Sequence, residues 1–209
     1  LWLVILYSSV LIAFYLLDKQ ATLKAILVLV LPALVFHLQS YWDNDLKIAF
    51  VNVGQGDCIV IELPYRKSVI VIDAGGLLRF DQEKWKERQT PYEVGRQIVV
   101  PYLKGRGIQS IDTFVLSHAD ADHVEGAEEV LREVIVKEVH VTPGSISKPV
   151  MNDFLQELKK TNTKLIEKMA GDYWNVGTTT FEYLWPADIE YEGNNDSLVI
   201  LVTYNQYKA

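Results

Sequence analysis

The sequence contains a single cysteine and few histidines, and its acidic residues outnumber its basic ones. Because Cys58 is alone, the chain can form no internal disulfide and no thiolate-rich metal site. The 20 Lys and Arg residues against 27 Asp and Glu residues give a formal net charge of −7, which argues against a protein that binds nucleic acid through a broad basic surface. A nuclease is not excluded, because bound metal ions add positive charge that a residue count omits.

Charged residues are absent from two apolar runs near the start of the chain, 1–17 and 25–38. A membrane-spanning helix needs about 20 mostly apolar residues. The second run reaches that length if it includes residues 21–41, with Lys24 extending toward the membrane surface. A buried helical hairpin and a signal peptide are the alternatives, but the basic region and cleavage site of a signal peptide are not visible. We therefore expect residues 1–42 to form a transmembrane helical hairpin, with lipid as a partner.

The charges around these runs indicate an orientation. Lys19 and Lys24 lie at the polar link between the runs, whereas residues 39–46 are acidic. The positive-inside rule then places the link in the cytoplasm and everything after residue 42 outside it. The chain begins with Leu1 and ends in a strand-like run, so we interpret it as a fragment of a larger multi-pass protein of the cell membrane.

From Leu46 onward the sequence changes to short β-branched runs that end at Gly or Pro, which is typical of strands. Residues 46–76 predict three strands in a meander, and residues 111–119 predict a buried strand that is followed by alternating helices and strands. Residues 77–97 are polar and charged, and we expect them to cross the surface of the sheet. Strands with helices between them predict an α/β sandwich in which helices cover sheets.

The stretch SHADADHVEG, residues 117–126, places four potential metal ligands within six positions: His118, Asp120, Asp122 and His123. At a strand end, positions 118, 120 and 122 tend to share one side, and His123 is expected to point elsewhere. Two residues could then serve each of two metal ions about 3.5–4 Å apart, an arrangement that clamps a phosphoryl group and activates a water. The alternative is a solvated acidic loop, which the placement of two of the 4 histidines here disfavours.

The spacing H-x-D-x-D-H resembles the metal loop of the metallo-β-lactamase superfamily, usually H-x-H-x-D-H. Asp120 in place of the second histidine resembles one branch, the DNA-internalisation competence proteins of the ComEC type. Further stretches resemble that branch: FVNVGQGDCIVIELP, VIDAGG, VVPYLKGRGIQSIDTFVLSHADADHVEG and NNDSLVILVTY. The resemblance implies a metallo-β-lactamase-like αββα four-layer sandwich over residues 46–209, incomplete at its C-terminus and preceded by two transmembrane helices. Asn52 departs from the aspartate that the family commonly has.

The resemblance also implies a role for each residue of the site. His118 and Asp120 would bind a first metal ion, and Asp122 and His123 a second, with Asp122 also the catalytic residue near the attacking water. Asp73 resembles the superfamily's supporting aspartate, which would hold a ligand rather than the metal. Asp57 would lie at the edge of the site, with a plain turn residue as an equal alternative.

The superfamily's bridging aspartate and remaining histidines would follow residue 209. His140 lies in an alternating run and matches none of them, so we interpret it as structural. Carboxylate in place of imidazole makes the site harder, which favours manganese or magnesium over zinc, with zinc retained as a candidate. We expect weak metal binding and little turnover from the fragment itself.

The function that the resemblance implies is a membrane-anchored, metal-dependent hydrolase domain of a DNA-uptake protein. Its substrate would be the phosphodiesters of incoming DNA in single-stranded form, with other competence proteins as partners. Two alternatives stay open at this point. One is a metallo-hydrolase that acts on another phosphoester, and the other is a non-catalytic module of a membrane DNA channel.

Overall fold

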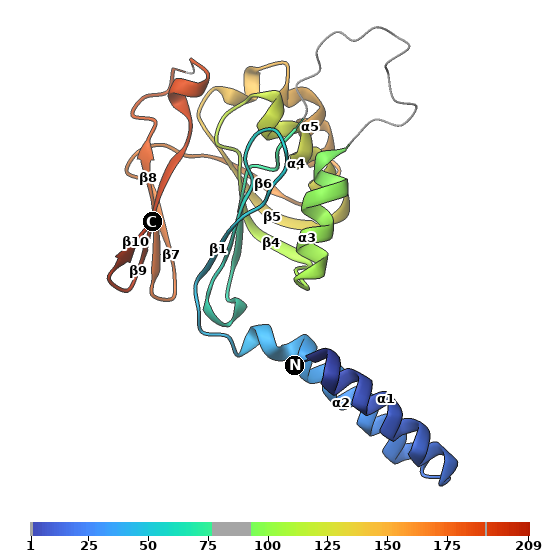
Figure 1. Ribbon diagram of the computed structural model, residues 1–209. Helices are drawn as coiled ribbons and strands as arrows, with labels where there is room; N and C mark the ends of the chain where they lie inside the picture. The colour runs from blue at the N-terminus through green and yellow to red at the C-terminus, as the bar shows by residue number, and fades with distance from the viewer. Residues whose placement is uncertain (1, 77–92, 191) are drawn as a thin grey trace, which may run out of the picture. The chain divides into compact units, whose positions relative to one another are not determined.

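The computed structural model describes residues 2–76, 93–190 and 192–209. Most of the polar stretch predicted to cross the sheet surface lies in residues 77–92, outside these ranges. The chain divides into two compact units (Figure 1). The first comprises Leu1–Asn44 with Pro64–Arg66, and the second comprises Asp45–Leu63 with Lys67–Ala209.

The first unit is a helical hairpin of α1 (Trp2–Asp18) and α2 (Thr22–Leu38), followed by the 3₁₀ turn η1 (Gln39–Tyr41). The two helices lie side by side (Figure 1). Small residues are buried where the helices meet, and these are Ser9, Ala13 and Ala25. Small side chains let two helix backbones approach closely. Large apolar side chains, such as Leu3, Leu11 and Leu31, are instead exposed in this unit.

The two transmembrane helices predicted for residues 1–42 are not supported. The helices α1 and α2 contain 17 residues each, fewer than the about 20 that cross a bilayer core. The second run was expected to reach spanning length by including residues 21–41, but α2 begins at Thr22 and gives way to a 3₁₀ turn at Gln39. Across residues 2–76, 93–190 and 192–209, no helix combines the length and apolar character that a membrane crossing requires.

The second unit contains a six-stranded sheet in the order β1-β2-β3-β4-β5-β6. Its strands are β1 (Lys47–Phe50), β2 (Ile59–Glu62), β3 (Val69–Ile72), β4 (Ser110–Val115), β5 (Ile135–Val141) and β6 (Lys164–Glu167). The first three strands are antiparallel, as the predicted meander requires. From β3 to β6 the strands are parallel, so each connection carries helical segments. Those segments are η4 (Gly95–Val99), α3 (Val100–Gly105), α4 (Ala121–Glu133), η5 (Ser145–Ser147) and α5 (Met151–Leu158).

A second sheet has the order β10-β9-β8-β7 and is antiparallel throughout. Its strands are β7 (Tyr173–Val176), β8 (Thr179–Trp185), β9 (Val199–Tyr204) and β10 (Tyr207–Lys208), with the 3₁₀ turn η6 (Asn194–Asp196) before β9. In Figure 1 the helices α3, α4 and α5 lie on one face of the six-stranded sheet and this second sheet lies on the other. The described residues thus form three layers, helix, sheet and sheet, of the expected α/β sandwich, where the resemblance implied four layers in the order αββα.

The alternation of side chains along the strands explains these layers. In β3, Val69 and Val71 belong to the core beneath the helices, whereas Ile70 belongs to the core between the two sheets. Phe114 and Val115 of β4 divide in the same way, because successive side chains of a strand point to opposite faces. Each fully buried Val, Ile or Phe contributes about 1.5–3 kcal/mol, so a strand that is apolar on both faces is most stable between two layers.

Candidate metal centre

The site is at the carboxyl ends of two neighbouring parallel strands, β3 and β4. Ile72 pairs with Val115 in the register, and the N–H of Asp73 donates to the Val115 carbonyl at 2.8 Å. Asp73 follows β3 directly, and Ser117 and His118 follow β4 after one more residue. Open α/β sheets hold their ligands outside such carboxyl ends, so the fold brings Asp73 to the motif that lies 44 residues further along.

The second half of the motif is helical. The helix α4 begins at Ala121, with Asp120 in an extended conformation as its N-cap, so Asp122 and His123 lie in the first turn. The sequence predicted an extended or loosely turned segment here, with His123 pointing elsewhere than positions 118, 120 and 122, and that interpretation is wrong. The helical turn returns His123 toward the strand end, and the rings of His118 and His123 have centroids 4.0 Å apart.

Each histidine of the motif faces one of its aspartates. Nε2 of His118 lies 3.5 Å from Oδ2 of Asp120, and Nε2 of His123 lies 3.9 Å from Oδ1 of Asp122. Asp120 makes no side-chain capping bond to α4, so its carboxylate is directed at His118 rather than at the helix. The two imidazoles are about nine-tenths buried, whereas the side chains of Asp120 and Asp122 are 48% and 25% exposed. The carboxylates therefore form the side of the site that solvent reaches.

The other ring nitrogen of each histidine, Nδ1, has a hydrogen-bond partner on the protein side of the site. Nδ1 of His123 lies 2.9 Å from Oδ2 of Asp73, and Nδ1 of His118 lies 2.9 Å from the hydroxyl of Ser117. Asp73 is buried and also accepts hydrogen bonds from the N–H and the hydroxyl of Ser117, at 2.8 and 2.6 Å. A carboxylate behind a histidine that orients the ring is the usual support of a metal-binding imidazole. Ser117 did not stand out in the sequence, although it directly precedes the first histidine of the motif.

The electrostatic surroundings shift the pKa values of the two histidines in opposite directions. Burial, together with the neighbouring His123, lowers the pKa of His118 despite the aspartates around it. Burial also acts to lower the pKa of His123, but the hydrogen bond and negative charge of Asp73 outweigh it and raise the pKa above its ordinary value. Cys58 is buried near Asp73 and Asp57, and burial raises the pKa of its thiol to about 12. It is therefore a neutral core residue and not a ligand.

Glycines hold the Gly-Gln-Gly-Asp turn and the stretch after β3 against the motif. A Cβ atom at Gly56 would overlap the backbone carbonyl of Asp122, and one at Gly76 would overlap that of Ala121. The N–H of Gly75 donates to the backbone carbonyl of Asp57 at 2.9 Å. Asp57 is exposed, and its charge acts on the pKa of His123. It therefore closes the turn with its backbone and contributes to the field of the site with its side chain.

The donor set fits part of a metal centre. Both Nε2 atoms face carboxylates and both Nδ1 atoms are engaged elsewhere, and imidazole nitrogen and carboxylate oxygen are both donors that divalent ions accept. Within the described ranges, however, no three His, Cys, Asp or Glu side chains converge as a ready metal site. The motif thus offers each ion one imidazole and one carboxylate, two of the ligands that it would take.

His140 is not brought to this site. It lies in β5, buried in the layer between the two sheets, with Nδ1 2.7 Å from the Tyr183 hydroxyl and Nε2 3.1 Å from Oε1 of Glu138. Thr113 donates to the same Glu138 oxygen at 3.1 Å, and Trp174 packs edge-on against the imidazole ring. Both ring nitrogens have protein partners, so His140 joins the two sheets.

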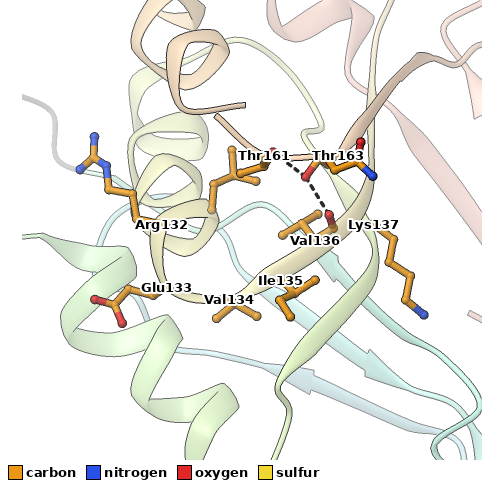
Figure 2. Close-up of a pocket in the computed structure, with 10 residues that line it drawn as sticks. Arg132, Glu133, Val134, Ile135, Val136, Lys137, Thr161 and Thr163 are labelled. Carbon is orange, nitrogen blue, oxygen red and sulfur yellow. Dashed lines mark hydrogen bonds between the residues drawn. The ribbon is translucent and has the colours of Figure 1, made fainter. Parts of the chain in front are cut away.

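A pocket in the described part of the chain is distinct from the motif (Figure 2). It is lined by the end of α4, the start of β5 and the turn before β6, with residues 131–137 and 161–163. Since β4 and β5 are parallel, this pocket is at the amino ends of the strands, opposite the motif. Its cations are paired, Arg132 with Glu157 at 3.0 Å and Lys137 with Asp112 at 2.5 Å, and we assign it no role.

Comparison with known proteins agrees with this fold. Residues 51–148, which contain the whole motif, match the model of the Metallo-beta-lactamase superfamily, and this match supports a metallo-β-lactamase-like α/β fold. The chain is 29% identical over 159 residues to "ComE operon protein 3" of Bacillus subtilis (strain 168). This match covers 76% of the chain and only 20% of that protein. The resemblance drawn from the sequence is confirmed.

Solved structures that match this chain include a metallo-β-lactamase from Cronobacter sakazakii with a HARLDQ motif. It is 14% identical, with a TM-score of 0.49, over 80% of this chain and 61% of that one. The metallo-β-lactamase fold protein YhfI from Bacillus subtilis is 13% identical, with a TM-score of 0.43, over 74% of this chain and 53% of that one.

Proposed function

We propose that this domain is a metal-dependent hydrolase that cleaves phosphodiester bonds, with incoming single-stranded DNA as its substrate. One observation carries the proposal. The rings of His118 and His123 lie side by side, 4.0 Å apart, and the Nε2 atom of each faces a partly exposed aspartate. Such a pair of donor sets supports a two-ion site of the closely spaced kind that phosphoester-cleaving enzymes use.

Proteins of this superfamily bind divalent metal ions, and the choice among manganese, zinc and magnesium is part of the proposal. A bound divalent ion would supply Lewis-acid charge and lower the pKa of a bound water toward about 7. His118 and Asp120 would hold one ion, and Asp122 and His123 the other. The two carboxylates among four donors make the set harder than an all-histidine site, which favours manganese.

Asp122 has the central role in this proposal. It lies in the first turn of α4, and its side chain is 25% exposed, so it reaches both His123 and the solvent side where a substrate would arrive. Its charge offsets that of an ion, and its second oxygen can orient the attacking water. Asp73 and Ser117 hold the histidines from behind and contact no substrate in this scheme.

The DNA substrate rests on the family resemblance and on similarity to a ComE operon protein. The chain spans about a fifth of that relative's length, so its place in a complete DNA-uptake protein, and other competence proteins as partners, are proposals. The net charge of −7 means that metal ions, rather than a basic surface, would attract the phosphates. A site outside the cytoplasm, where incoming DNA would be met, is a further proposal, and a reporter fused after Ala209 that is active only when exported would test it.

A second candidate is a non-catalytic module of a DNA channel. It is favoured by the finding that no three potential ligands converge in the parts of the chain that the structure describes. The two candidates differ in a direct assay. Full-length protein is incubated with single-stranded DNA, duplex DNA and bis(p-nitrophenyl) phosphate, each with manganese, zinc, magnesium or a chelator.

If the domain is a nuclease, cleavage requires metal and is faster for single-stranded DNA than for bis(p-nitrophenyl) phosphate. Equal cleavage of both substrates would point instead to a metallo-hydrolase of other phosphoesters. If the protein binds DNA but leaves all three substrates intact with every metal, the proposed function is contradicted and the domain is a non-catalytic module.

A further inference from the structure

Ser117 is between the buried carboxylate of Asp73 and the imidazole of His118. Its hydroxyl lies 2.6 Å from Oδ2 of Asp73 and 2.9 Å from Nδ1 of His118. Its backbone N–H donates to Oδ1 of Asp73 at 2.8 Å. The same Oδ2 atom lies 2.9 Å from Nδ1 of His123. One carboxylate therefore contacts His123 directly and reaches His118 through a single hydroxyl group.

The direction of these hydrogen bonds follows from proton counting. A carboxylate accepts hydrogen bonds, and a serine hydroxyl has one proton to donate and two lone pairs to accept with. The Ser117 proton goes to Asp73, so its oxygen is left to accept from Nδ1–H of His118. A neutral imidazole carries one N–H, and Nε2 of His118 is then a bare acceptor that faces Asp120.

We propose that Ser117 is a positioning residue that fixes His118 in its Nδ1–H tautomer, so that Asp73 presents the Nε2 atoms of both histidines to the site. The inference rests on the proposed metal centre, since a bare Nε2 atom is what a metal ion requires. The tautomer itself can be measured in metal-free protein, so it can be tested separately from the proposed function.

His118 also has a competing tautomer available. Without the Ser117 hydroxyl, Nδ1 of His118 loses its hydrogen-bond acceptor, and the proton can move to Nε2, where Asp120 Oδ2 lies 3.5 Å away and accepts it. That tautomer would place a proton on the nitrogen that must bind the ion. The hydroxyl therefore selects between two states of one imidazole, both of which the surrounding residues can accommodate.

The backbone of Ser117 is held independently of its side chain. Its N–H donates to Asp73, and its carbonyl accepts from the N–H of Leu198 at 2.8 Å. Removal of the hydroxyl leaves both bonds in place, so Ser117→Ala should keep the strand end and the fold. Ser117→Thr keeps a hydroxyl at the same position. Ser145→Ala is a matched control, because it removes a buried hydroxyl that donates to the Thr142 carbonyl at 2.7 Å.

The tautomer of His118 is measured by long-range proton–nitrogen NMR of metal-free protein at pH 8, where an imidazole of ordinary pKa, about 6.5, is neutral. The proposal expects the Nδ1–H form in the wild type, in Ser117→Thr and in Ser145→Ala, and a shift toward Nε2–H in Ser117→Ala. An Nε2–H tautomer in the wild type overturns the proposal, whether or not any variant folds.

Zinc and manganese affinities by calorimetry give the second readout. Ser117→Ala should weaken binding about 10–100-fold, as the loss of a group that orients a ligand does, and Ser117→Thr should restore it. Unchanged affinity in Ser117→Ala overturns the proposal while leaving the metal centre intact. Failure of the wild type to bind any metal, with the Nδ1–H tautomer present, would instead contradict the proposed function.

Discussion

The side chains of Asp73 and His123 meet across 50 residues of sequence, with Oδ2 of Asp73 2.9 Å from Nδ1 of His123. The contact joins the end of β3 to the first turn of α4, and it turns Nε2 of His123 toward Asp122. It exists because β3 and β4 are parallel neighbours whose carboxyl ends meet at one edge of the sheet. The orientation of the proposed ligands is thus a property of the fold as well as of the motif.

Asp73→Asn should weaken zinc binding about 10–100-fold, the usual cost of losing a group that supports a metal-binding histidine. The amide keeps the shape of the carboxylate, but it removes the charge that favours Nδ1–H of His123. Calorimetric titration of both proteins measures the effect. Asp112→Asn is the control, because Asp112 also accepts a backbone hydrogen bond, from the N–H of Val69 at 2.7 Å. Equal affinities in wild type and Asp73→Asn would contradict the assigned role.

Gly56→Ala should cost more stability than Gly54→Ala, although both glycines have positive φ angles, of 73° and 85°. At Gly54 nothing lies within 4 Å of an added Cβ, whereas at Gly56 the Cβ would overlap the carbonyl of Asp122. We expect Gly54→Ala to lower the free energy of unfolding by about 1 kcal/mol, from backbone strain alone. Gly56→Ala should lower it by at least about 2 kcal/mol more, because the added Cβ displaces the start of α4. Urea unfolding of the two variants gives the comparison, and equal losses would show that the turn does not press on the motif.

His140→Ala should lower the free energy of unfolding by about 2–5 kcal/mol, because it leaves buried partners such as Tyr183 without their hydrogen bond and opens a cavity between the sheets. Metal affinity should be unchanged in the folded variant. Denaturant unfolding and calorimetry on the same sample separate these effects. A large loss of metal affinity without a loss of stability would make His140 a ligand after all.

Glu128→Gln should stabilise the protein at pH 8 and have little effect at pH 4. Burial, with the nearby charge of Asp153, raises the pKa of Glu128 from 4.5 to about 7. A raised folded-state pKa favours folding fully below the unfolded pKa, and that contribution is lost as the pH rises through about 7. At pH 8 the folded chain therefore holds an unfavourable charge that Gln removes.

The expected gain is about 1–3 kcal/mol, reduced by loss of the 3.7 Å ion pair between Glu128 and Arg132. Urea unfolding of both proteins at pH 4 and pH 8 measures it. A gain that is equal at the two pH values would show that the charge of Glu128 is not responsible.

Much of this architecture follows from local pattern. The β-branched runs predicted β1 to β5, because the alternation of side chains and the glycines that end a strand are visible within a few residues of sequence. The start of α4 was missed because Asp120, Ala121 and Asp122 are equally typical of a loop, and the N-cap Asp120 makes no side-chain hydrogen bond to the helix. The short strand β6 carries little hydrophobic signal in KLIE, and parallel pairing with β5 determines it.

In the site, too, local sequence predicted some features, and contacts between distant segments determine the others. The four motif residues could be found from sequence because they are adjacent in the chain. Their support could not, since the contacts of Ser117 with Asp73 and of Leu198 with Ser117 join segments distant in sequence. The helical hairpin was predicted from two apolar runs, but its helices contain 17 residues each, and helices of membrane-spanning length are not supported in the described part of the chain.

The central claim is that the motif is a catalytic metal centre, and Asp122→Asn in full-length protein tests it most directly. Asn keeps the shape of Asp122 but loses the charge that offsets a divalent ion. We predict that manganese-dependent cleavage of single-stranded DNA falls about 100-fold or more, while the melting temperature is unchanged. Loss of a residue that only supports a ligand lowers activity about 10–100-fold, and loss of a ligand itself should cost at least as much. Asp153→Asn, in the first turn of α5, should cleave at the wild-type rate. Cleavage by Asp122→Asn at the wild-type rate would contradict the account.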